Sequence, residues 1–131
     1  MSHGQHNESK TAEKDTVLQV SKENGEIISS KGEIADTLCT RIVGLLGRKG
    51  LDSEQALILT RCKQVHMFFM KFSIDVLFCS SAGEVLAVEE NLKPWRASKF
   101  VRRSSFVIEL PEGKIKEKKI RVGEKIAIIR D

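Results

Sequence analysis

The stretch IDVLFCSSAGEVLAVEE, residues 74–90, indicates the class of fold. Its first six residues are mostly apolar and include β-branched and aromatic side chains, which favour a buried strand. Residues 81–84 (SAGE) have the composition of a turn, and the apolar side chains of residues 85–88 then alternate between the two sides of an extended chain. We therefore predict an antiparallel hairpin, with one strand over residues 74–79 and its partner over residues 84–90.

Further strands are predicted on both sides of this hairpin. Short runs rich in apolar and β-branched residues place them at residues 17–21, 26–29, 56–60, 65–70 and 105–110, and a last strand follows a turn within residues 122–130. The dipeptide Asn24-Gly25 indicates a tight turn between the first two strands.

One substantial helix is predicted among these strands. It begins at Asp36 or Thr37, either of which can accept a hydrogen bond from a free backbone N–H, and it ends at Gly47. Residues 114–120 (KIKEKKI) are expected to form a helical turn. Many short strands with one substantial helix predict an α+β, mostly β fold: a small barrel or half-barrel of short strands.

The length and composition indicate one soluble domain. Residues 1–15 are polar and lack apolar periodicity, which predicts a disordered tail, so that residues 16–131 form a single domain. The chain is 40% hydrophobic and 31% charged, a balance typical of soluble globular proteins. The formal net charge of +4 favours weak attraction to polyanions but does not by itself indicate nucleic-acid binding.

The sequence also disfavours membrane and extracellular proteins. No run approaches the roughly 18–20 apolar residues that span a bilayer. The polar N-terminus lacks the apolar segment of a signal peptide, so we expect a cytoplasmic location. We also expect the protein to be a monomer. Cys39, Cys62 and Cys79 are odd in number and widely spaced, unlike an extracellular disulfide framework.

Cys62, His66 and Asp75 lie within the apolar stretch of residues 62–79 and are candidates for a functional site. Cys62 and His66 are residue types that bind zinc, but on a strand they would lie about 13 Å apart, too far for one zinc ion. The chain has no C-x2-C or H-x3-H pair, and His3 and His6 in the polar N-terminus make a poor metal site. We therefore predict no metal site and no cofactor.

Two other interpretations of these three residues stay open. Cys62 could be a nucleophile, with His66 as its base and Asp75 orienting the imidazole, although no helix N-terminus follows Cys62 to lower its thiol pKa. Alternatively, His66 and Asp75 are polar groups satisfied within a half-buried sheet, where Asp75 needs donors from His66, an arginine or backbone amides. A ligand pocket can use the same residues.

Residues 91–105 form a basic segment without an acidic residue. Its five cations are Lys93, Arg96, Lys99, Arg102 and Arg103. Trp95, the only tryptophan, stands beside Arg96, and together they could hold a phosphate, a carboxylate or a sugar face. A solvated basic loop with Trp95 covering one end of the core is an equal alternative. Nucleic-acid binding is less favoured, because no stacking platform of several aromatic residues is evident.

The motifs, taken in order, resemble those of the domain of unknown function 192 (DUF192) family, in particular a branch with Cys-x3-His and Pro-Trp-Arg. They are GLLGRKGL (44–51), CKQVHMFFMKFSIDVLF (62–78), LKPWR (92–96), VIELPEG (107–113) and VGEKI (122–126). The matching positions include Arg41, Gly44, Leu45, Arg48, Cys62, His66, Asp75, Pro94, Trp95, Arg96, Glu109 and Gly113. Departures occur at Cys79 and Glu124, where the family often has an acid and an aspartate. The resemblance implies a compact, mostly β, barrel-like fold with a helix, and no established activity.

These observations favour a non-catalytic module that binds an unknown small ligand or protein, over a thiol-dependent hydrolase or transferase using Cys62 and His66. A basic module that binds nucleic acid is the third alternative. The predicted ligand-binding residues are Cys62, His66, Asp75, Trp95 and Arg96.

Overall fold

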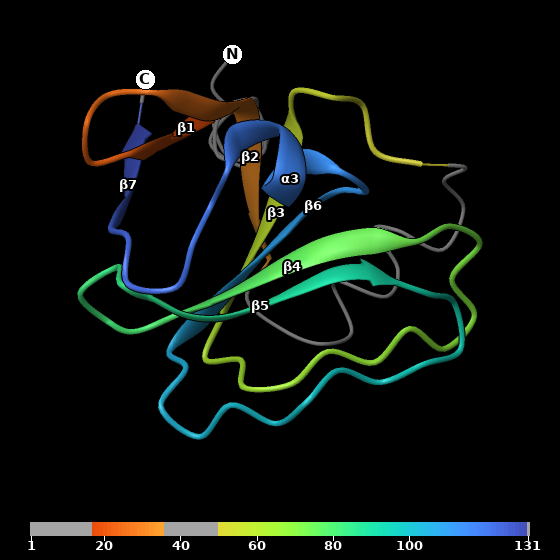
Figure 1. Ribbon diagram of the computed structural model, residues 1–131. Helices are drawn as coiled ribbons and strands as arrows, with labels where there is room; N and C mark the ends of the chain where they lie inside the picture. Colours follow the sequence, from red (N-terminus) through yellow and green to blue (C-terminus); the bar gives the residue numbers. More distant parts are fainter. Residues whose placement is uncertain (1–16, 36–49, 131) are drawn as a thin grey trace, which may run out of the picture.

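The computed structural model describes residues 17–35 and 50–130. Within them lie the strands β1 (Leu18–Lys22), β2 (Ile27–Ala35), β3 (Gln55–Thr60), β4 (Ile74–Cys79), β5 (Val85–Leu92), β6 (Phe106–Pro111) and β7 (Ile126–Arg130), and the short helix α3 (Lys114–Lys118). The strands form one seven-stranded sheet in the order β5-β4-β6-β3-β2-β1-β7 (Figure 1). Neighbouring strands are antiparallel, except that β2 and β3 run parallel.

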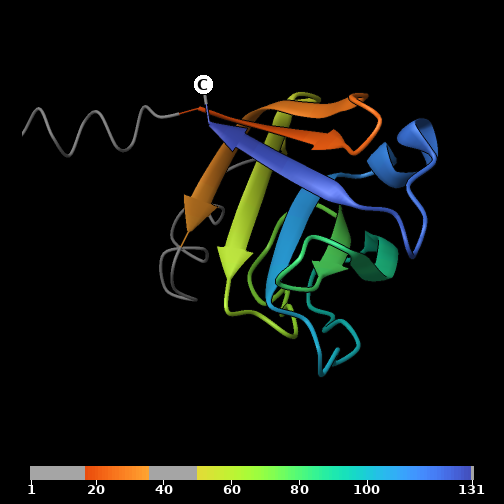
Figure 2. The same cartoon turned by 90° about the vertical axis from the view of Figure 1, so that its left-hand side faces the viewer.

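The sheet curls into a half-barrel, and its two edge strands meet at one end. Figure 2 shows β1 and β7 turned at a steep angle to β3 and β6. At the meeting point, Val85 N–H donates to Glu124 O at 2.9 Å and Ile126 N–H donates to Gly83 O at 2.8 Å. Gly83 has a φ of +90°, and a Cβ there would lie 2.6 Å from Ile126 O. The glycine of the β4–β5 turn therefore allows the close backbone approach that joins the two edges.

Apolar side chains pack on both faces of the central strands. In β4, Leu77 belongs to a core cluster that includes Ile115 of α3, whereas its neighbours Val76 and Phe78 belong to a second cluster. Residues 65–70 contribute to that second cluster. Because β4 is covered on both faces, its sequence is apolar almost throughout instead of alternating with polar residues. The loop that carries His66 thus forms part of the cover of the second core.

Most of the fold expected from the sequence is confirmed. The fold is mostly β and barrel-like, residues 74–79 and 85–92 pair as an antiparallel hairpin, and residues 114–118 form the expected helical turn. β2 is longer than predicted. The helix predicted from Asp36 or Thr37 to Gly47, the tail over residues 1–15 and Cys39 fall outside the described residues. No helix in the described part of the chain is long and apolar enough to cross a membrane.

The strand predicted over residues 65–70 is wrong. Only His66 makes a bridge, with Ala97, and a turn follows at once. Met70 N–H donates to Met67 O at 3.3 Å, and Phe69 has a φ of +65°, which no strand residue adopts. A β-rich composition was therefore outweighed by the tertiary contacts of this segment.

Candidate functional site

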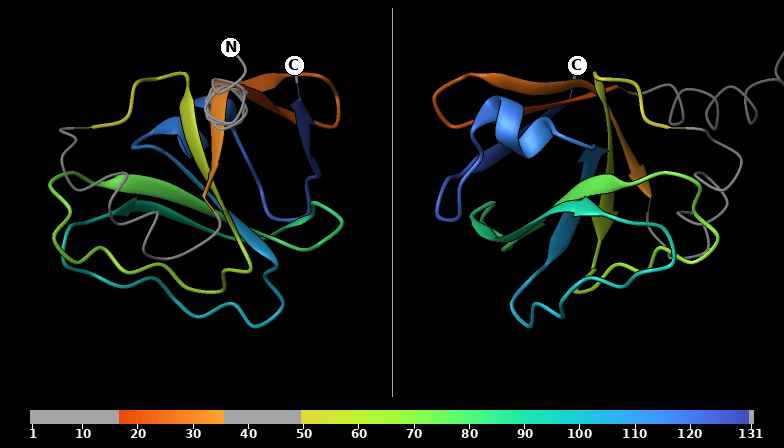
Figure 3. Two further views of the ribbon diagram at one scale, coloured as in Figure 1. Left: turned by 180° about the vertical axis from the view of Figure 1, so that it is seen from behind. Right: turned by 45° about the vertical axis from the view of Figure 1, so that its right-hand side comes forward.

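The predicted site residues Cys62, His66, Trp95 and Arg96 lie on two antiparallel loop segments, residues 61–73 and 93–105, which we call the paired loops. The two segments run side by side in Figure 1 and in both views of Figure 3. Five backbone hydrogen bonds join them: Cys62 N–H to Ser105 O (3.4 Å), Met67 N–H to Arg96 O (2.8 Å), Trp95 N–H to Met67 O (2.7 Å), Ser98 N–H to Val65 O (2.8 Å) and Val101 N–H to Lys63 O (2.8 Å). The paired loops thus form an irregular two-stranded ribbon.

Side chains reinforce this ribbon from within. The buried Ser98 hydroxyl accepts a hydrogen bond from Val65 N–H at 2.9 Å and donates to Lys99 O at 2.8 Å. The buried Ser104 hydroxyl donates to Cys62 O at 2.8 Å. Since buried backbone groups need partners, these serines replace part of the ladder that a regular strand pair would supply. The ribbon is therefore a fixed support for the side chains on its surface.

Each of the paired loops makes a tight turn at the same end of the ribbon. Residues 67–70 are closed by the hydrogen bond from Met70 to Met67, and residues 93–96 by one from Arg96 N–H to Lys93 O at 3.2 Å. The third residue of each turn has positive φ: +65° at Phe69 and +68° at Trp95. This is the pattern of a type II turn, in which glycine is the favoured third residue.

Aromatic residues at these two positions are costly for the fold. A left-handed conformation costs roughly 1–2 kcal/mol for a residue with a Cβ. Strain of this kind, retained where glycine would relieve it, is concentrated at functional sites. Phe69 and Trp95 are also exposed, at 62% and 59%, so core packing does not explain them. The two turns therefore mark a candidate binding surface.

His66, Phe68, Phe69 and Trp95 form what we call the aromatic cluster. The Phe69 and Trp95 rings meet edge to face with centroids 4.8 Å apart, and Phe68 lies 6.3 Å from Trp95. Phe68, 49% exposed, also stacks on the His66 ring at 5.4 Å. His66 Nδ1 is buried and has no hydrogen-bond partner among the described residues. An unpartnered buried polar atom costs roughly 1–3 kcal/mol, a second sign that local stability is not optimised here.

The paired loops carry a strong positive charge. They contain eight basic residues and no acidic residue: Arg61, Lys63, Lys71, Lys93, Arg96, Lys99, Arg102 and Arg103. All eight are exposed. The rest of the chain then has 14 basic and 18 acidic residues, so the net charge of +4 is an average over a basic ribbon and an acidic remainder. Such a separation of charge orients an approaching anion toward the aromatic cluster.

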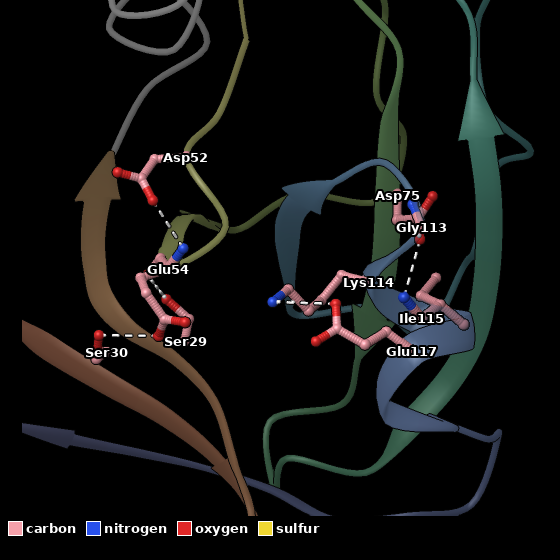
Figure 4. A network of polar contacts seen from close by, with 9 residues as sticks. All are labelled: Ser29, Ser30, Asp52, Glu54, Asp75, Gly113, Lys114, Ile115 and Glu117. Atoms are coloured by element: carbon pink, nitrogen blue, oxygen red, sulfur yellow. Dashed lines mark hydrogen bonds and ion pairs between the residues drawn. The ribbon is translucent and has the colours of Figure 1, made fainter.

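Asp75 is held differently from the other predicted site residues. It is fully buried in β4, and its carboxylate accepts three backbone N–H bonds, one from Asn91 (2.9 Å) and two from Gly113 (3.1 Å) and Ile115 (2.9 Å). Figure 4 shows Asp75 beside Gly113 and Ile115. In the described residues, no hydrogen bond joins Asp75 to His66. The carboxylate therefore ties β4 to β5 and to the start of α3, with backbone amides as its donors.

The cysteines are placed in two environments. The half-buried Cys62 thiol donates to Gln64 O at 3.3 Å. Cys79 is fully buried at the end of β4, and this burial raises the pKa of its thiol from 9.0 to about 12. Over residues 17–35 and 50–130, no three His, Cys, Asp or Glu side chains gather in a group that could hold a metal ion.

A shallow polar cleft of about 350 Å³ lies elsewhere, between the β1–β2 turn and the turn before β7. Its lining residues are Lys22, Glu23, Asn24, Gly123, Glu124 and Lys125, none of them a predicted site residue. The Lys22 ammonium is already engaged there by Glu124 at 3.4 Å and Lys119 O at 3.2 Å.

Phe68 and Phe69 were missed as site residues by sequence reasoning, because a run of apolar residues favours a buried strand. The structure instead brings them beside Trp95, 26 residues further along the chain than Phe69. One available signal was the absence of acids from both segments: residues 55–74 and residues 91–105 contain no acidic residue, although only the second stretch was used in the prediction.

Comparison with known proteins agrees with the geometry of the fold. The model of the DUF192 family, described as "Uncharacterized ACR", matches residues 19–128. The chain belongs to the DUF192 family. UPF0127 proteins are among its relatives: one of Pyrococcus furiosus is 34% identical over 116 residues, covering 84% of this chain and 95% of the relative. One of Thermococcus sibiricus is 32% identical over 113 residues, covering 83% and 73%.

Two solved structures share the fold. A protein of Sinorhizobium meliloti, provisionally described as a transcription regulator, superposes with a TM-score of 0.70 at 21% identity, covering 86% of this chain and 92% of the other. A protein of unknown function from Novosphingobium aromaticivorans gives a TM-score of 0.71 at 20% identity, covering 84% and 82%.

Proposed function

We propose that this member of the DUF192 family is a non-catalytic binding module whose contact surface is the aromatic cluster with the basic residues of the paired loops. The observation that carries the proposal is the pair of adjacent turns that hold Phe69 and Trp95, both exposed, in the left-handed conformation. Exposed aromatic side chains kept at a cost to the fold are typical of recognition surfaces.

The charge of the same surface favours an anionic partner. Arg96 follows Trp95 directly, and Lys71 and Lys93 flank the two turns. Cations beside exposed rings can bind an anion while the rings contact its apolar parts. The S. meliloti protein with the same fold is provisionally described as a transcription regulator, which is compatible with an anionic partner.

Two features support binding over thiol chemistry. The Cys62 thiol donates to the Gln64 carbonyl at 3.3 Å, and a carbonyl oxygen cannot act as the base that a nucleophile needs. The Asp75 carboxylate, which would orient such a base, accepts three backbone bonds. The cytoplasmic location and the monomeric state expected from the sequence stay predictions.

Trp95 supplies the test, because as the only tryptophan it reports directly from the proposed surface. Its fluorescence is titrated with four anionic probes: polyphosphate, polyglutamate, a 15-nucleotide oligothymidylate and phosphatidylserine vesicles. We expect at least one probe to shift the emission of Trp95. Phe69→Gly should then weaken the affinity for that probe by tenfold or more. Ile129→Ala, at an exposed apolar residue of β7, is the control and should bind like the wild type. If no probe binds, or Phe69→Gly binds normally, the proposal is wrong.

A further inference from the structure

We propose that the anionic partner is a single-stranded nucleic acid that lies along the paired loops, with its bases stacked on exposed aromatic rings and its phosphates bound by the interleaved cations. This inference rests on the proposed function and adds the class of partner to it. Three features of the described residues carry it: the arrangement of aromatic rings, the spacing of the cations and the extended shape of the ribbon.

The aromatic rings are accessible at both ends of the ribbon. The aromatic cluster occupies the end with the two turns. Phe100, 62% exposed, lies near the other end, because it precedes Val101, whose N–H donates to Lys63 O at 2.8 Å. Trp95 and Phe100 are five positions apart in the chain, so their backbones lie at most roughly 16 Å apart. An elongated ligand with several flat faces fits such a spacing better than a compact anion does.

The structure also supplies the stacking platform that the sequence did not reveal. Rings from two segments far apart in the chain meet in the aromatic cluster, and Phe68, Phe69 and Trp95 each remain about half exposed or more. Every nucleobase has a π-face, so stacking on such rings tolerates any sequence.

Cations accompany the rings along the whole ribbon. Lys93, Arg96, Lys99 and Arg102 recur at every third residue of one segment. The opposite segment adds Arg61 and Lys71, whereas the Lys63 ammonium is engaged by Arg102 O at 2.8 Å and Ser104 O at 2.9 Å. Lys99 N–H donates to the Glu89 carboxylate of β5 at 3.2 Å, so one acid lies beside this segment. Residues three apart in an extended chain project to opposite faces, so on one face Arg96 can meet a phosphate near the aromatic cluster and Arg102 another near the far end of the ribbon.

This distribution favours a nucleic acid over the other polyanions. A membrane-binding loop would use only the rings and cations at the two turns, whereas the exposed Phe100 and Arg102 lie away from them. An acidic peptide would satisfy the cations but offers few flat faces to the exposed rings. A duplex hides its base faces by stacking, so single strands should bind better than duplexes.

The experiment measures fluorescence anisotropy of labelled 15-nucleotide oligothymidylate and oligouridylate with the full chain, from 50 to 300 mM NaCl. Both should bind, with the logarithm of affinity falling against the logarithm of salt at a slope of about −0.7 per phosphate contacted. Phe69→Gly and Trp95→Gly should each weaken binding by about 5- to 150-fold, the range seen for loss of one stacked base. Arg96→Gln should make the slope less steep by about 0.7.

Matched controls separate this surface from general basicity. Lys116→Gln removes an exposed cation on α3, and Ile129→Ala removes an exposed apolar side chain on β7; both should bind like the wild type. Circular dichroism melting checks that the glycine variants are folded.

Each remaining outcome decides between the two proposals. Binding to phosphatidylserine vesicles, to polyglutamate or to a 15-base-pair duplex, but not to the single strands, overturns the nucleic-acid proposal and leaves the binding surface in place. Single-strand binding that Lys116→Gln weakens as much as Arg96→Gln also overturns it. If none of these probes binds at 50 mM NaCl, both proposals fail.

Discussion

Replacing Asp75 with asparagine should destabilise the fold strongly without touching the proposed binding surface. The buried carboxylate accepts N–H bonds from Asn91, Gly113 and Ile115. An asparagine that keeps its oxygen toward Gly113 and Ile115 turns an amide N–H₂ toward Asn91 N–H, so one charge-assisted bond, of about 1.5–3 kcal/mol, is lost. The two retained bonds lose their ionic character and about half their strength, or about 1 kcal/mol each.

The expected loss is therefore about 4 kcal/mol, a large part of the stability of an ordinary domain. Urea unfolding followed by circular dichroism measures it, and with a denaturant slope of about 2 kcal/mol/M the midpoint should fall by about 2 M. Asp52→Asn is the matched control: Asp52 is exposed and accepts one backbone bond, from Glu54 N–H at 3.1 Å, so the change should cost less than about 1 kcal/mol. A loss below 1 kcal/mol for Asp75→Asn would refute the reasoning that its three bonds hold β4, β5 and α3 together.

Three further predictions concern other parts of the fold. Phe69→Gly should raise the free energy of unfolding by up to about 1 kcal/mol, because glycine tolerates a φ of +65°; chemical denaturation that shows a loss above 1 kcal/mol would contradict this. In thermal unfolding, Gly83→Ala should lower the free energy of unfolding by at least 2 kcal/mol more than Gly25→Ala does. Both glycines have positive φ, but only a Cβ at Gly83 would meet backbone, at 2.6 Å from Ile126 O. Equal losses for the two variants would argue against the close contact of the two sheet edges. At pH 8, Cys79 should be alkylated only as fast as the protein unfolds, whereas Cys62 should be alkylated faster; mass spectrometry of labelled peptides would refute this by finding Cys79 labelled first. Because the folded-state pKa of Cys79 is raised, the contribution of this thiol to stability is complete below pH 9.0 and is lost as the pH rises toward about 12.

The sequence drew attention to Trp95 and Arg96 of the candidate site, but not to Phe68 and Phe69 or to the form of the surface. Trp95 and Arg96 stood out because a lone tryptophan beside an arginine in an acid-free segment is conspicuous in sequence. Asp75 stood out as a carboxylate in an apolar strand, but its partners lie 16, 38 and 40 residues away, so no local pattern could name them. The start of α3 is therefore capped by a carboxylate on the distant strand β4 instead of by a side chain close to it in the sequence.

The sequence by itself determined the elements whose signals are local. The apolar run of residues 74–79, the turn at residues 81–84 and the alternation after it specify a hairpin, because side-chain period and turn chemistry act over a few residues. The same signals predicted the helical turn at residues 114–118 and the last strand.

Only the tertiary structure decided that residues 65–70 form a loop and that this loop binds residues 93–101 to make one surface. Val65 and Met67 are drawn into the second core, and their backbone groups bond to Ser98 and Arg96 instead of to a sheet. Those contacts outweigh the β-propensity of the segment and hold Phe69 and Trp95 in a conformation that neither would adopt alone. The physical reason is that long-range packing and hydrogen bonding can supply the few kcal/mol that local preference opposes.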